Sequence, residues 1–96
     1  MIKIYIAGKI TGDPEYKEKF EAAKNLISTL IAEAIVLNPA ENPPGMSKSD
    51  YMRLSFAMID CADLVYFLPD WEESGGARLE HAYCDYIEKM IFEAQT

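Results

Sequence analysis

Short apolar runs alternate along the chain with segments whose apolar residues recur at helical spacing. Four runs have the composition of β-strands: residues 2–7, 34–37, 64–68 and 90–94. Nearly every position of the first run is apolar, which is typical of a central parallel strand covered on both faces. The last run has a second interpretation as the frayed end of a helix, because no glycine separates it from the preceding helical pattern.

Three helices are predicted between these runs. The first starts with Asp13 as N-cap and Pro14 in its first turn. Its apolar side chains recur at helical spacing, at Tyr16, Phe20, Ala23, Ile27 and Leu30. The second follows a capping box at Ser47–Asp50 and runs to about Asp60, and the third starts near Gly75.

This alternation of strand and helix predicts an α/β fold with three layers. We expect a parallel sheet of about four strands in the order 2-1-3-4, joined by right-handed crossovers and covered by helices on both faces. The proline-rich residues 40–45 are expected to form an extended loop that is neither helix nor central strand. In such a fold a ligand binds at the carboxyl ends of strands 1 and 3, where the strand order reverses.

Glu80 is the first candidate for chemistry. In the third helix one apolar arc is formed by Leu79, Tyr83, Tyr86, Ile87 and Met90. Glu80 lies on the edge of this arc and His81 lies opposite it. A core-facing carboxylate needs partners or has perturbed acidity, so Glu80 is a candidate nucleophile or general base. The alternative is a first-turn glutamate that extends into solvent.

The residues just before Glu80 favour the functional interpretation. Ser74 and the two glycines after it place small residues at a helix N-terminus, where a phosphate or hydroxyl can approach closely and free N–H groups can donate to its oxygen. The loop at residues 8–12, with Gly8 and Ile10, is the second candidate for ligand contact. It lacks the Gly-x-Gly-x-x-Gly fingerprint of dinucleotide-binding proteins, and it is equally consistent with a plain turn between strand and helix. Both loops leave the predicted sheet at the same edge, so we expect them to converge.

Composition and charge narrow the classes of function. The 96 residues, half of them hydrophobic, fit a single domain over residues 1–96. No run approaches membrane-spanning length and no signal peptide is recognisable, so we expect a cytoplasmic protein that does not bind membranes. Cys61, Cys84 and one histidine support neither a metal site nor a disulfide. The net charge of −7 belongs to residues 49–96, which argues against binding of long nucleic acid but permits a small ligand.

Six short motifs occur in order along the chain. They are Lys3–Gly8, Asn38-Pro39, Tyr51–Arg53, Cys61–Asp63, Leu68-Pro69-x-Trp71 and Ser74-x-Gly76-Ala77-x-x-Glu80. Together they resemble a phage and bacterial family of unknown function, which is similar to the nucleoside 2-deoxyribosyltransferases and deoxynucleoside monophosphate N-glycosidases. The resemblance covers nearly the whole chain. It implies a flavodoxin-like (Rossmann-like) fold, a nucleoside 2-deoxyribosyltransferase-like domain over residues 1–96, and no cofactor.

The resemblance also implies roles for individual residues. Glu80 would attack the anomeric carbon of a 2-deoxyribose, for which a buried carboxylate is both nucleophile and electrostatic stabiliser, as in retaining glycosidases. Ser74 and Gly76 would hold the 5' oxygen or phosphate. Tyr5 and Gly8 would line the sugar and base site. The predicted function is cleavage or transfer of the base of a 2-deoxynucleoside or its 5'-monophosphate.

A second acid is expected, because the base leaves only if it is protonated. Relatives carry an aspartate where this chain has Ser55, and Asp70 or Asp63 are candidates to compensate. Asp70 also has an interpretation as a loop substitution for glycine, and Asp63 as the end of a helix. Trp71 either stacks on the base or anchors its loop. The alternative to an enzyme is a module that binds a nucleotide-like ligand or a protein without turnover.

A homodimer or larger homo-oligomer is expected. A four-stranded α/β unit of this length leaves apolar helix surface to cover. Size is a departure from the resemblance: the enzymes are longer and complete each site with residues from a neighbouring subunit's C-terminal region, which we expect this chain to lack.

Overall fold

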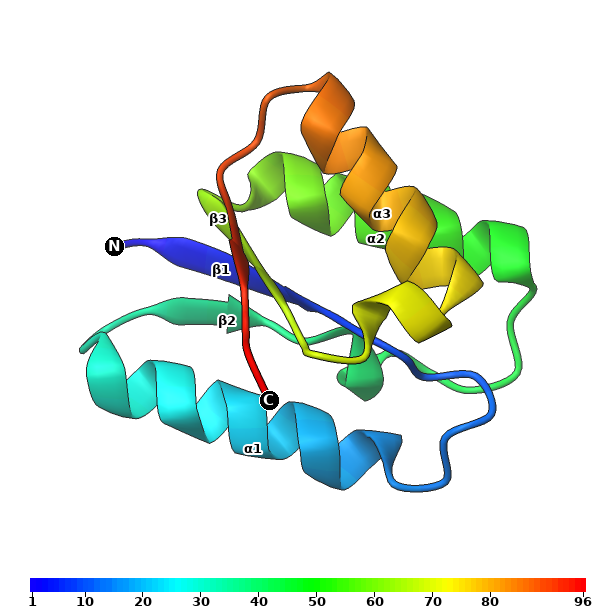
Figure 1. The fold of residues 1–96 in the computed structure, drawn as a ribbon, viewed down its shortest axis with the longest axis horizontal. Helices are drawn as coiled ribbons and strands as arrows, with labels where there is room; N and C mark the ends of the chain where they lie inside the picture. The colour runs from blue at the N-terminus through cyan, green and yellow to red at the C-terminus, as the bar shows by residue number, and fades with distance from the viewer.

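Four strands form one parallel sheet in the order β2-β1-β3-β4, which confirms the predicted topology (Figure 1). The computed structural model describes residues 1–96. No helix is long and apolar enough to cross a lipid bilayer. The elements are β1 (Lys3–Ala7), α1 (Tyr16–Leu30), β2 (Ile35–Leu37), η1 (Pro39–Glu41), α2 (Lys48–Cys61), β3 (Leu64–Phe67), η2 (Trp71–Glu73), α3 (Gly75–Tyr86) and β4 (Ile91–Glu93).

The sheet separates two hydrophobic layers. Helix α1 lies on one face, while α2 and α3 lie on the other (Figure 1). Successive side chains of β1 point to opposite faces, so Ile4 and Ile6 pack with the buried residues of α1, and Tyr5 and Ala7 pack in the cluster under α2 and α3. This alternation directs the Tyr5 side chain toward the α2/α3 layer, where the candidate site lies.

Helix α3 presents a different face to the core from the one predicted. Its buried residues are Ala77, Glu80 and Cys84, whereas Leu79 and Tyr86 from the expected apolar arc are 50% and 89% exposed. The predicted arc was therefore wrong, and Glu80 is central to the buried face rather than at its edge. Small side chains at positions 77 and 84 let α3 pack closely beneath Glu80, which a count of apolar residues does not detect.

The observed starts of α1 and α2 can be compared with the starts predicted from the sequence. The capping box of α2 is confirmed: Ser47 Oγ accepts from the Asp50 N–H at 3.1 Å, and Asp50 Oδ2 accepts from the Ser47 N–H at 3.4 Å. Helix α1 begins at Tyr16, later than predicted, and the Asp13 carboxylate accepts from the Glu15 N–H at 2.9 Å in the turn that precedes the helix.

The connection after β2 and the one after α3 bear on two of the predictions. The loop after β2 contains a single 3₁₀ turn, η1, so the prediction of no helix there was wrong; Asn38 Oδ1 caps that turn by accepting from the Ala40 N–H at 3.0 Å. Residues 91–93 form strand β4 rather than a frayed helix end. Glu88 adopts a φ of 58°, in the left-handed region, so the chain leaves α3 without the glycine that usually ends a helix there.

Candidate active site

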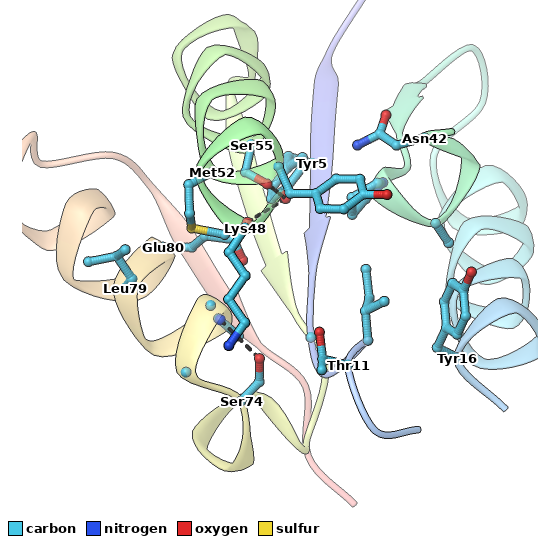
Figure 2. Close-up of a pocket in the computed structure, with 18 of the residues that line it drawn as sticks. Tyr5, Thr11, Tyr16, Asn42, Lys48, Met52, Ser55, Ser74, Leu79 and Glu80 are labelled. Carbon is cyan, nitrogen blue, oxygen red and sulfur yellow. Dashed lines mark hydrogen bonds between the residues drawn. The ribbon is translucent and has the colours of Figure 1, made fainter. Parts of the chain in front are cut away.

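A cavity of about 680 Å³ lies at the carboxyl end of β1, next to the loop from β3 to α3. Its walls come from the loop after β1, the loop after β2, α2 and the start of α3 (Figure 2). This is the edge at which the strand order reverses. Seven of the nine predicted site residues line the cavity: Tyr5, Gly8, Ile10, Ser55, Ser74, Gly76 and Glu80. Asp70 and Trp71 do not.

Glu80 lies in the cavity wall with only 4% of its surface exposed. The Tyr5 hydroxyl donates a hydrogen bond of 2.5 Å to Glu80 Oε2, and Ser55 Oγ lies 3.0 Å from the Tyr5 oxygen. A phenol has one proton to give, so when Tyr5 donates to Glu80 the Ser55 hydroxyl completes the second contact by donating to Tyr5. Both partners are themselves buried. The three groups form a chain that holds one carboxylate in a fixed orientation.

The acidity of Glu80 is strongly perturbed. Burial raises the pKa of its carboxyl from 4.5 to about 7, while the hydroxyl groups of Tyr5 and Ser55 favour the ionised form and lower the pKa. Burial, followed by the charge of Glu80, raises the pKa of Tyr5 well above its usual value. Glu80 is therefore harder to ionise than an ordinary glutamate, and its nucleophilic, charged form gains as the pH rises.

Cys84, one helical turn after Glu80, is not a competing nucleophile. Burial and then the charge of Glu80 raise the pKa of its thiol to about 11. A thiol that stays protonated is a poor nucleophile. Cys61 is exposed on α2, and no group of three side chains is arranged to hold a metal ion.

The start of α3 forms the wall beside Glu80. Ser74 caps the helix, its Oγ accepting from the Ala77 N–H at 3.1 Å. The N–H groups of Gly75 and Gly76 belong to the first turn and have no partner within the helix. A Cβ on Gly76 would lie 3.2 Å from the Met52 methyl group, so glycine there avoids a tight contact with α2.

Lys48 is a cavity residue that the sequence analysis did not identify. It is the first residue of α2, and its side chain extends toward Ser74 (Figure 2). Its amino group makes no ion pair within the chain, since the ion pairs involve other cations. The available signal was its position just after the Ser47 cap of a helix that starts at the ligand edge of the sheet.

The loop after β1 contributes in a different way from that predicted. Gly8 lines the cavity, but a Cβ there would lie 2.6 Å from Leu68 Cδ1. The requirement for glycine therefore comes from packing against the end of β3. Ile10 and Thr11 also line the cavity, and the loop after β2 adds Asn42 on the far side.

Asp70 and Trp71 make contacts outside the cavity. Asp70 accepts from the Lys9 N–H at 3.2 Å and pairs with Lys19, which also binds Asp13 at 2.5 Å. This cluster joins the loop after β1 to the loop after β3. The Trp71 indole stacks on the His81 ring at 4.0 Å between centroids, and its edge meets Phe67.

Asp63 is equally remote from the cavity. Its carboxylate accepts from the Lys3 N–H at 2.8 Å, at the start of β1. The chain therefore offers no aspartate at the position where a second acid was expected.

The fold is that of a deoxyribosyltransferase. The solved structure of the 2-desoxiribosyltransferase from Leishmania mexicana matches with a TM-score of 0.72 at 22% sequence identity, over 100% of this chain and 65% of that one. This chain thus spans a little under two thirds of that enzyme's length. The chain belongs to the DUF4406 family, a domain of unknown function whose sequence profile matches residues 2–93. No curated protein matches it. The predicted relation between an unknown-function family and this enzyme fold is confirmed.

Proposed function

We propose that the protein cleaves the N-glycosidic bond of a 2-deoxynucleoside or its 5'-monophosphate, with Glu80 as the nucleophile. The observation that carries the proposal is a single carboxylate, 4% exposed, set in the wall of a cavity large enough for a nucleotide and oriented by Tyr5. Small-molecule sites are typically about 300–1,000 Å³. The first base is released, and the deoxyribosyl group is transferred either to water or to a second base.

The chemistry has two steps. A Glu80 oxygen attacks the anomeric carbon as the bond to the base breaks, and the electron pair of that bond leaves with the base. The sugar passes through an oxocarbenium-like state that the negative carboxylate stabilises, and it is then held as an ester. Water or another base next attacks the anomeric carbon, the bond from that carbon to the Glu80 oxygen breaks, and the attacking group loses its proton to solvent. The Tyr5 hydrogen bond keeps the carboxylate pointed at one position throughout.

The 5' end of the substrate binds at the start of α3. Gly75 and Gly76 provide unpartnered N–H groups, and a helix N-terminus favours an anion. The Lys48 side chain points toward the same place and makes no ion pair within the chain (Figure 2). Its ammonium group favours a 5'-phosphate over a 5'-hydroxyl. The expected consequence is that Lys48→Met raises KM for a monophosphate more than for the matching nucleoside.

One observation favours a second candidate, a binding module without turnover. The buried Ser55 beside Tyr5 carries a hydroxyl at the position where a second acid was expected, so no carboxyl group stands there to protonate a leaving base. In this case a nucleotide raises the melting temperature but no base is released. The two candidates therefore differ in product formation rather than in ligand binding.

The test measures base release by chromatography, with the four deoxynucleosides and their 5'-monophosphates as substrates, with and without an added free base. We expect product with the wild-type protein and none with Glu80→Gln. Glu72→Gln is the matched control, because Glu72 is exposed and lies outside the cavity. Turnover that survives Glu80→Gln would exclude Glu80 as nucleophile, and melting shifts without product would favour the binding module.

A further inference from the structure

The cavity is poor in groups that can give a proton to a leaving base. Its titratable side chains are Tyr5, Tyr16, Lys48, Tyr51, Glu73 and Glu80. Only two of these carry a carboxyl group, the usual acid in glycosidic bond cleavage. One is Glu80, which is occupied as the nucleophile and cannot act as the acid in the same step. The other is Glu73.

Glu73 and Lys48 belong to the end of the cavity that receives the 5' group. Glu73 directly precedes the helix cap Ser74, is exposed, and lies at the cavity rim. The Lys48 side chain extends toward Ser74 as well (Figure 2). With the sugar above Glu80 and its 5' end at Ser74, the base occupies the opposite end of the cavity. Figure 2 shows Tyr16 and Asn42 on that side, away from Leu79 and Ser74.

The base end therefore has polar and aromatic groups but no acid. The Tyr51 hydroxyl donates to the Pro43 carbonyl at 2.6 Å, so its proton is already engaged. Tyr16 is a phenol, which is a much weaker acid than a carboxyl group, and Asn42 is an amide. The Tyr5 proton is committed to Glu80.

The remaining candidate acids are held elsewhere. Asp70 is fixed by Lys19 and the Lys9 N–H, and Asp63 by the Lys3 N–H. Ser55, buried beside Tyr5, carries a hydroxyl rather than a carboxyl. No carboxyl group of the chain other than that of Glu80 lies within the interior of the cavity.

We propose, resting on the function proposed above, that the substrates are N-glycosides of cationic bases, such as N7-alkylated purines, which leave without being protonated. As Glu80 bonds to the anomeric carbon, the electron pair of the glycosidic bond moves onto the base nitrogen and cancels its positive charge. The base departs neutral, and no proton is transferred. Water then opens the glycosyl ester, and the proton it loses goes to solvent. The aromatic faces of Tyr16 and Tyr51 suit a cationic ring.

The test uses a matched pair of substrates, 2'-deoxyguanosine 5'-monophosphate and its N7-methyl derivative. The rate of base release is measured for each with and without the protein. We expect the ratio of the two enzymatic rates to equal the ratio of the two uncatalysed rates, because the protein protonates neither base. A protein that supplies a general acid would reduce the ratio by about 100-fold or more, the usual contribution of such a group.

Two variants sharpen the comparison. Ser55→Asp introduces a carboxyl group at the buried position beside Tyr5, and we expect it to speed release of guanine relative to N7-methylguanine. Ser49→Asp is the control, since it adds the same charge at an exposed position on α2 outside the cavity. A rate ratio that Ser55→Asp leaves unchanged counts against the inference.

The outcomes separate this inference from the function on which it rests. Glu80-dependent release of both bases with a ratio reduced by about 100-fold would overturn the inference and leave glycosidic-bond cleavage standing. Absence of release from either substrate, over an incubation that would detect one turnover per molecule, would overturn the proposed function itself. A ratio equal to the uncatalysed one, together with loss of both activities in Glu80→Gln, supports both.

Discussion

Glu80→Gln should make the protein more stable at neutral and alkaline pH while leaving its shape intact. The buried carboxyl has a pKa raised from 4.5 to about 7 by desolvation. Below pH 4.5 it is protonated in the folded and the unfolded chain, so it costs little. Between pH 4.5 and about 7 the unfolded chain loses the proton first, and stability falls as the pH rises. Above about pH 7 the buried charge lowers the free energy of unfolding by its full amount, about 3 kcal/mol.

Glutamine carries no charge to bury, so the variant does not incur this cost. The free energy of unfolding of Glu80→Gln relative to wild type should therefore increase by about 2–3 kcal/mol between pH 5 and pH 8. Urea titrations of both proteins at the two pH values measure this difference, in which the contributions of all other titrating groups cancel. Glu72→Gln, at an exposed position, should show no such change. An equal pH dependence of Glu80→Gln and wild type would refute the desolvation argument.

Three other predictions follow from the contacts around the cavity. Tyr5→Phe removes the donor to Glu80, so the pKa of the carboxyl should rise further and the rising limb of kcat/KM against pH should move to higher pH; an unmoved limb would contradict this. Gly8→Ala should lower the free energy of unfolding, measured by urea denaturation, by about 1–3 kcal/mol. Adding Leu68→Ala should recover part of this loss, because it removes the side chain that the new Cβ meets. If the losses of the two substitutions simply add, the predicted contact is contradicted. Asp70→Asn should lower the free energy of unfolding by up to about 1 kcal/mol, because it weakens the ion pair with Lys19. The pH dependence of base release should not change. Loss of base release would show instead that Asp70 takes part in the reaction.

The fold was predictable because its signals are local. The apolar runs, the Ser47–Asp50 capping box and the prolines after β2 each act within a few residues, and the alternation of strand and helix allows few topologies. The exception was β4, where the choice between strand and frayed helix depended on a glutamate in the left-handed region. A non-glycine residue gives no sequence signal of that conformation.

The candidate site was predictable in part because two loops leave the same edge of a parallel sheet. The contact between Tyr5 and Glu80 spans 75 positions, and no periodicity encodes it. Asp70 likewise finds its cation on α1, 51 positions away, which removes it from the cavity. The face of α3 that packs against the core is the one with small side chains, at positions 77 and 84, because these let the helix approach closely.

The exposed apolar residues of α3 bear on the expected homo-oligomer, which stays a prediction. Leu79 lines the cavity and is also half exposed, and Tyr86 and Met90 continue along the outside of the chain after it. Sedimentation at micromolar concentration tests the expectation. A monomer would mean that these side chains remain in water, and a dimer weakened by Tyr86→Ser would locate the interface on this helix.

The covalent bond proposed between Glu80 and the sugar can be detected by mass spectrometry of acid-quenched reactions. Substrate is mixed with the protein, quenched in acid within the first turnovers, and digested. We expect a peptide containing Glu80 that is heavier by one deoxyribosyl or deoxyribosyl phosphate group in the wild-type protein, and no such peptide in Glu80→Gln. Base release by the wild-type protein with no such adduct, and equal release by Glu80→Gln, would contradict it.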